Sequence, residues 1–208
     1  MWVKYHQEIT RKALQEFLPP LALNEIIKAN SKQDALFYQL GHSHFHFDNN
    51  SFKESRSYIQ DQRKKLFSCL EKYQPVSAWK HFGRLLHSLQ DFFAHSNYVT
   101  LWLERFDQKS LPHHESIDAC DEQILESSHL HSGRLYYPLE VLSFIPGIRT
   151  LVLPLLPRDS HAWMALDGPE SGENFSFAFS AAVKRTKIEF EDIISELSVE
   201  QLALFLSD

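Results

Sequence analysis

The chain has 208 residues, of which 43% are hydrophobic and 13% aromatic, so it is long enough to bury a substantial core. Its formal net charge of −6 argues against a protein that binds nucleic acid electrostatically, and we expect no stable nucleic-acid complex. Twelve histidines accompany only two cysteines, so a bound metal would have histidine and aspartate ligands rather than thiolates.

Hydrophobic periodicity predicts helices along most of the chain. A first helix is expected over residues 3–18, because the two prolines that follow cannot continue it. A second helical segment is expected over residues 23–40, with a break near Asn30 and Ser31. Residues 41–50 are dense in histidine and are expected to form a loop.

The middle of the chain is expected to hold two long helices. Ser51 and Glu54 have the spacing of a capping box and predict a helix that extends to Tyr73. After a proline, a longer helix is expected from near Ser77 to about Phe106. This second helix carries the most informative motif of the chain.

The last third is less regular and then becomes helical again. Residues 117–127 are a short helical candidate, and residues 129–172 contain five of the nine prolines. Residues 175–197 show strong amphipathic periodicity, which predicts a long helix. Ser198 and Gln201 form a second capping-box pair and predict a final short helix.

No alternating strand pattern appears, so we expect an all-α fold in one compact multi-helix domain over residues 1–208. The N-terminal residues lack the apolar stretch of a signal peptide, and residues 139–156 are too short and too interrupted to span a membrane. These observations favour the cytoplasm by default. Cys69 and Cys120 could be two thiols or one disulfide, and free thiols are the favoured interpretation.

His87, Asp91 and His95 lie four residues apart among large apolar side chains. On a helix this spacing places all three groups on one side over about two turns. A carboxylate and two imidazoles are costly to bury without partners, and a metal cation would remove that cost. The motif therefore predicts a metal site on a buried helix.

Two further groups precede this motif. His6 is alone on the first helix, where a surface or hydrogen-bonded role is the more common one. In the histidine-rich loop, histidine alternates with phenylalanine, so an extended backbone would place His44, His46 and Asp48 on the same side. That loop is as consistent with a metal site as with a solvated turn.

A fourth group, His161 and Asp167, follows the irregular segment, whereas His113 and His114 resemble an exposed turn. Facing helices of a bundle build sites from several segments, and two zinc ions need about six to eight ligands in total. A carboxylate such as Asp91 can bridge such a pair. The zinc-protease motif, the nucleophile elbow and the phosphate-binding loop are all absent from the sequence.

Four segments together resemble the all-helical zinc-dependent phospholipase C superfamily, which includes single-strand-specific zinc nucleases and Het-C-like proteins. Residues 86–97 resemble the Het-C-type motif L-H-x-x-Q-D-x-x-A-H-S-N, and residues 46–49 (HFDN) resemble the H-F-x-D segment before it. Residues 2–9 are similar to the N-terminal W…H-x-x-I motif, and residues 160–169 resemble the downstream H…N-x-D-x-P element. The similarity to Het-C-like bacterial proteins is the closer one.

The resemblance implies a ligand set for two zinc ions. Asp91 would bridge them. His46 and His87 would complete one ion, and His95 and His161 would help to hold the second.

For the remaining residues, the resemblance implies that His6 belongs to a third metal position or its surroundings, and that Asp48 or Asp167 is a ligand or a general base. The implied reaction is attack of metal-activated water on a phosphodiester, with two or three zinc ions as the cofactor. The implied partner is a phosphodiester substrate, which a phospholipid would satisfy.

Two alternatives stay open beside a phospholipase C-like hydrolase: a single-strand zinc nuclease, and a non-catalytic Het-C-like module stabilised by metal. Peripheral membrane contact is a further possibility, because residues 136–157 are apolar and interrupted by prolines. This stretch is either a lipid-facing lip or, as is more common, a pair of packed helices. The sequence makes no prediction of the oligomeric state.

Overall fold

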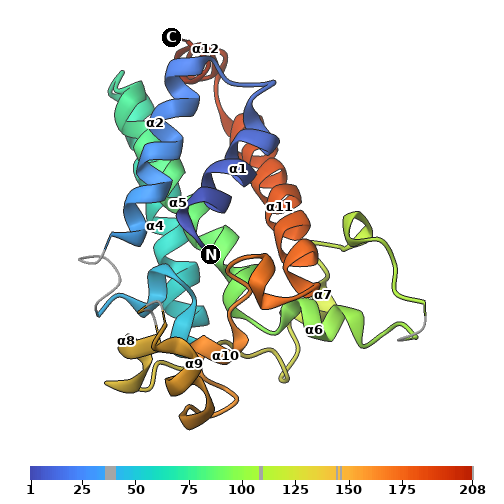
Figure 1. Ribbon diagram of the computed structural model, residues 1–208. Coiled ribbons are helices and arrows are strands. Elements are labelled where there is room, and N and C mark those ends of the chain that lie inside the picture. Colours follow the sequence, from blue (N-terminus) through green and yellow to red (C-terminus); the bar gives the residue numbers. More distant parts are fainter. Residues whose placement is uncertain (36–40, 108–109, 144, 146, 208) are drawn as a thin grey trace.

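The computed structural model describes residues 1–35, 41–107, 110–143, 145 and 147–207, and in these residues the fold is all-α. No strand occurs in these ranges, where the only extended pairings are isolated bridges between Ser96 and Ser132 and between Arg134 and Ser160. Figure 1 shows the arrangement of the α-helices. They are α1 (Val3–Leu14), α2 (Pro20–Ser31), α4 (Phe52–Glu71), α5 (Pro75–His95), α6 (Tyr98–Leu103), α7 (Glu122–Leu125), α8 (Leu139–Ser143), α9 (Arg149–Val152), α10 (His161–Met164), α11 (Asn174–Glu196) and α12 (Val199–Phe205).

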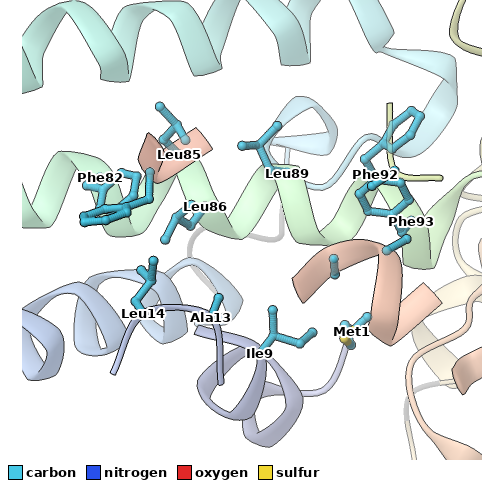
Figure 2. Packing of buried hydrophobic residues seen from close by; sticks show 14 of the residues in the cluster. Met1, Ile9, Ala13, Leu14, Phe82, Leu85, Leu86, Leu89, Phe92 and Phe93 are labelled. Atoms are coloured by element: carbon cyan, nitrogen blue, oxygen red, sulfur yellow. The ribbon is translucent and has the colours of Figure 1, made fainter. Parts of the chain in front are cut away.

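Helix α5 is the centre of the bundle and packs against α2, α4 and α11. From Leu85 to His95 every residue of α5 is buried, so the helix is enclosed on all sides. Figure 2 shows the apolar part of this packing, with Leu86 of α5 facing Leu14 and Ala13 of α1. Polar groups on α5 are therefore held inside the core, where they need partners.

Helix α5 passes close to α2 at Gly83. A Cβ atom at this position would lie 2.3 Å from the Ile26 carbonyl oxygen and 2.9 Å from the Ala29 Cβ atom. Glycine thus permits the backbone contact that sets the spacing of these two helices.

We expect Gly83→Ala to destabilise the fold by about 1–3 kcal/mol, because the added methyl group must push α2 away. In an exposed helix the same change would stabilise by roughly 0.5–1 kcal/mol. Urea unfolding measures the difference, with exposed Lys80 on the same helix changed to alanine as the control. An unchanged or higher unfolding midpoint for Gly83→Ala would contradict the close contact.

Prolines mark the starts of α2 and α5, and local turns end α1 and α2. Helix α1 ends at Leu14, four residues before the expected end, and the chain then turns toward the prolines. Pro20 and Pro75 occupy the first turns of α2 and α5, where no backbone N–H is needed. The expected break near Asn30 and Ser31 is confirmed, since α2 ends at Ser31; residues 36–40 of that predicted segment lie outside the described residues.

The long helix is shorter than expected. It ends at His95 instead of continuing to Phe106, because Ser96 adopts an extended conformation and its hydroxyl donates to the Phe92 carbonyl at 2.6 Å. The Asn97 side chain then accepts from the His131 backbone N–H at 2.9 Å, which ties this corner to a distant loop. Helix α6 begins after the corner.

One of the two capping boxes is confirmed. Ser198 and Gln201 make both reciprocal hydrogen bonds at the start of α12. The box at Ser51 and Glu54 is wrong, because the Ser51 hydroxyl donates to the Asp48 carbonyl at 2.7 Å and gives α4 no side-chain cap.

The irregular segment contains the short helices α8, α9 and α10, which pack over a small separate core of Val152, Leu156 and Ala162. The 117–127 candidate contains only the single turn of α7. Cys69 and Cys120 are both free and partly buried, as favoured from the sequence. Within the described part of the chain, none of the helices has the length and hydropathy that crossing a membrane requires.

Candidate metal centre

The residues chosen from the sequence converge from five segments on one buried region beside α5. Each is at most 8% exposed, and each has a polar atom within 4 Å of another member of the set. They come from α1, the 3₁₀ turns before α4, helix α5, helix α10 and the residues after it. The set comprises His6, His46, Asp48, His87, Asp91, His95, His161 and Asp167.

One group with metal-ligand geometry contains His6, Asp34, His87 and Asp91, whose ligand atoms all lie within 4.8 Å of one another. Asp34, at the end of a 3₁₀ turn (Lys32–Asp34), was missed from the sequence. Its Oδ2 atom lies 3.8 Å from His6 Nε2, and its Oδ1 atom lies 3.7 Å from His87 Nε2. The expected helix break just before it was the only sequence signal.

A second group contains Asp48, His95 and His161, all buried. Asp48 Oδ1 lies 2.8 Å from His161 Nδ1 and 3.6 Å from His95 Nδ1. The His95 Nδ1–H also donates to the His46 carbonyl at 2.9 Å, so its Nε2 faces the opposite side of the ring.

Asp91 connects the two groups. Its Oδ1 atom lies 3.1 Å from His6 Nε2 and 3.8 Å from His95 Nε2. Its Oδ2 atom lies 2.8 Å from His46 Nδ1 and 3.0 Å from His87 Nε2. A carboxylate with histidines of both groups around it has the position of a bridging ligand.

The tautomer of His6 follows from a buried hydrogen-bond chain. The Thr10 hydroxyl donates to the His6 carbonyl at 2.8 Å, so its oxygen accepts from the Gln90 amide nitrogen at 3.1 Å. The Gln90 amide oxygen therefore faces His6 Nδ1, at 2.7 Å, and that nitrogen carries the proton.

The same chain fixes His87. The Asn30 amide nitrogen donates to the Gln90 amide oxygen at 3.0 Å, which turns the Asn30 oxygen toward His87 Nδ1 at 3.2 Å. Both imidazoles thus donate through Nδ1 to an amide oxygen, the arrangement that orients metal-binding histidines.

The Nε2 atoms of His6 and His87 consequently face the carboxylates of Asp34 and Asp91, and His87 Nε2 also lies 3.1 Å from His46 Nδ1. His6 Nε2 and Asp34 Oδ2 are buried and have no hydrogen-bond partner. Acceptors that face acceptors in a buried site repel one another, and a divalent cation between them would convert the repulsion into coordination. Imidazole and carboxylate donors without thiolates suit zinc, so the residues present fit that metal.

Burial and nearby opposite charges shift the pKa values of the clustered side chains in opposite directions. Burial opposes ionisation of Asp91, but the Met1 ammonium and the neighbouring imidazoles hold the pKa of its carboxyl well below its usual range. Burial lowers the pKa of His87 to about 4, so this ring is neutral at pH 7 and its Nε2 atom is an acceptor, 3.1 Å from His46 Nδ1. Burial also opposes protonation of His161, but the charge of Asp48 raises its pKa to about 9.

The amino group of Met1 lies at the edge of the cluster. It donates to Asp91 Oδ1 at 2.7 Å and lies 2.9 Å from Asp167 Oδ1 and 3.0 Å from His95 Nε2. Burial disfavours its charged form, but the carboxylates of Asp167 and Asp91 outweigh this and raise its pKa to about 11. A cation is thus well accommodated between these three side chains.

The loop that supplies His46 and Asp48 is not extended, so the alternation argument was wrong about its shape. Two 3₁₀ turns with left-handed residues at Phe47 and Asn49 direct His46 and Asp48 into the core. His44 instead packs edge-on against the ring of Tyr58, outside the cluster.

His161 is held by the irregular segment. The buried carboxylate of Glu140 accepts from the Ala162 backbone N–H at 2.6 Å, which fixes the first turn of α10. A Cβ atom at Gly133 would lie 2.6 Å from the Cα atom of His161, so glycine permits this approach.

We expect Gln90→Met to weaken zinc binding by about 10–100-fold, because His6 Nδ1–H loses the acceptor that orients the ring. A competition titration against a chromogenic chelator measures the affinity. Gln62→Met is the matched control, since Gln62 is also buried and its amide oxygen pairs with a histidine, His81 Nδ1, at 2.8 Å, away from the cluster. Equal zinc affinities for the two variants would contradict the proposed orienting role.

Comparisons with known proteins agree on one family. A family model described as the VWA7 N-terminal domain matches residues 8–127. Von Willebrand factor A domain-containing protein 7 is 30% identical in Homo sapiens and 29% identical in Rattus norvegicus, each over 92 residues. These matches cover 44% of this chain and 10% of each relative, so the chain corresponds to about a tenth of their length. No solved structure matches. Because the family model covers more than half of the sequence, the chain belongs to the VWA7 N-terminal domain family.

Proposed function

We propose that this chain is a zinc-dependent phosphodiesterase of phospholipase C type. The observation that carries the proposal is the pair of histidine–aspartate groups joined by Asp91, with imidazole Nε2 atoms that face carboxylates. Sites with two neighbouring metal ions are common in enzymes that hydrolyse phosphate esters. The resemblance of residues 86–97 to the Het-C-type motif supports the same reaction class.

Bound zinc would supply a water of lowered pKa and positive charge beside the phosphate oxygens. The surrounding side chains would have separate roles. Asp48 orients His161 through the 2.8 Å contact at Nδ1 and leaves Nε2 of that ring for a ligand. Asp167 belongs to neither ligand group, and His95 and the Met1 amine help to hold the pKa of its carboxyl well below its usual range against the effect of burial. It lies 3.2 Å from His95 Nε2 at the edge of the cluster, and this position makes it our candidate for the general base.

A second candidate is a metal-stabilised module without catalytic activity. The observation that favours it is burial, since His6, His87 and Asp91 are completely inaccessible to solvent. Structural zinc sites are fully ligated and closed, whereas catalytic sites keep one position open. The two candidates therefore differ in whether a water position remains on the metal.

Metal analysis combined with phosphodiester hydrolysis tests the proposal. Purified protein is analysed for zinc content and then assayed on bis(4-nitrophenyl) phosphate, phosphatidylcholine vesicles and single-stranded DNA. We expect stoichiometric zinc and hydrolysis that the Asp167→Asn variant loses while its zinc is retained. Stoichiometric zinc without turnover on any of the three substrates would establish the structural module instead. Turnover of DNA alone would establish a nuclease.

A further inference from the structure

The α8–α10 unit, described over residues 134–143, 145 and 147–163, carries a concentration of exposed apolar side chains. Leu151 and Leu155 are 74% and 68% exposed, and they lie four residues apart on adjoining helical turns. A second row, in sequence order, consists of Tyr137 before α8, Val141 on α8 and Ile145 after it. Isolated exposed apolar residues are ordinary, but two such rows in one small unit indicate a contact surface.

These rows are not the packing face of the unit. The small core beneath is formed by Val152, Leu156 and Ala162, with Trp163 packed against it. The short helices are therefore apolar on both sides, one side facing this core and the other facing solvent. The segment is thus a set of packed short helices that also carries exposed apolar side chains.

The formal net charge of this unit is positive, whereas that of the whole chain is negative. The whole sequence has a net charge of −6, yet this unit contains three arginines, Arg134, Arg149 and Arg158, against two acidic residues. One of those two, Glu140, is completely buried. The other, Asp159, lies 3.6 Å from Arg134. The remaining arginines are fixed close to the surface: Arg149 donates to the Ala162 carbonyl, and the Arg158 guanidinium lies 3.8 Å above the Trp163 ring.

Exposed leucines, a tyrosine and rigid arginines on a short helical projection are the features of a surface that lies in the headgroup region of a bilayer. Arginine side chains near such a surface are attracted to anionic lipids. A protein partner for the same rows would need complementary acidic groups and a shaped groove, whereas a membrane requires only protruding apolar tips beside positive charge.

We infer that the α8–α10 unit is a membrane-docking surface that binds bilayers containing anionic lipid. The exposed rows enter the interfacial region, and Arg149 and Arg158 contact the headgroups. The inference does not depend on the hydrolase proposal, because docking requires neither a metal nor turnover.

The surface adjoins the metal centre. Glu140 of α8 binds the backbone of α10, whose first residue is His161. The negative charge of Asp48 also reaches the hydroxyl of Tyr137, whose pKa is raised by partial burial and by that charge. A docked bilayer would therefore lie close to the candidate catalytic side chains.

Vesicle flotation of the whole chain tests the inference. The probes are vesicles of phosphatidylcholine alone and of phosphatidylcholine with phosphatidylserine. The variant Leu151→Glu/Leu155→Glu replaces two exposed side chains, so its fold is expected to remain intact. The matched control is Val199→Glu, because Val199 is 87% exposed on α12, at the other end of the molecule in Figure 1.

We expect the chain to float with the anionic vesicles and to bind them less strongly as salt is raised. The double variant should bind at least about tenfold more weakly, because two leucines no longer enter the interface. The Val199→Glu control should bind like the unchanged protein.

Absence of vesicle binding by the unchanged protein, or equal binding by the double variant, would overturn the inference. So would a dimer in size-exclusion chromatography that the double variant converts to monomer without vesicle binding, because the rows would then join two copies of the chain. Neither result bears on the hydrolysis assay with soluble bis(4-nitrophenyl) phosphate, so the two proposals fail separately.

Discussion

Asp91→Asn is expected to abolish both zinc retention and phosphodiester hydrolysis while leaving the helical fold in place. The substitution keeps the shape of the side chain but removes the charge that faces His6, His46 and His87. Loss of groups that only orient ligands typically costs 10–100-fold, so we expect a decrease of at least about 100-fold in zinc affinity for this direct contact. Hydrolysis should fall to the background rate.

The control for this experiment is Asp61→Asn. The Asp61 side chain is 51% exposed on α4 and contacts Lys65 and the Gln62 amide, away from the cluster, so its loss should change neither zinc content nor activity. Far-UV circular dichroism confirms that both variants remain helical. Full zinc content in Asp91→Asn would show that this carboxylate does not bridge the two groups.

Removal of metal with a chelator should lower the melting temperature by about 8–16 °C. Zinc that binds only the folded chain stabilises it by about 4 kcal/mol at a thousandfold excess over Kd. For a chain of this size each kcal/mol corresponds to roughly 2–4 °C. The physical cause is the concentration of negative charge, because a cation would neutralise the carboxylates of Asp34 and Asp91, which both lie within 4 Å of His6 Nε2.

Calorimetry with and without EDTA measures this shift, and added zinc should restore the original value. Asp91→Asn serves as the control, since a variant without bound zinc should melt at the same temperature in both buffers. An identical melting temperature for the unchanged protein before and after chelation, with zinc removal verified by elemental analysis, would contradict a stabilising metal.

The sequence was most informative where polar groups repeat at helical spacing within an apolar segment. His87, Asp91 and His95 could be placed on one face of a buried helix because the period of the helix fixes their relative positions. The family model matches residues 8–127, which include this motif. His6 and His161 lie outside that range, and they reach the cluster only through the packing of α1 and α10.

The features missed from the sequence depend on tertiary contacts. Asp34 is an isolated aspartate at the end of a short turn, so no periodic pattern distinguishes it from a surface residue. The shape of the 42–50 loop depends on Asn49, whose side chain accepts from the Leu135 backbone N–H at 2.8 Å across 86 positions of sequence. The end of α5 likewise depends on Asn97 and a distant loop. Local propensity contains no information about such partners.

The order of the ligands along the chain also has a consequence for biosynthesis. All four side chains of the first group are present once Asp91 has been translated. The second group is incomplete until His161 has been translated. At bacterial and eukaryotic elongation rates of 5–20 residues per second, this interval is roughly 4–14 seconds. A nascent chain thus passes through a stage in which one ligand group exists without the other.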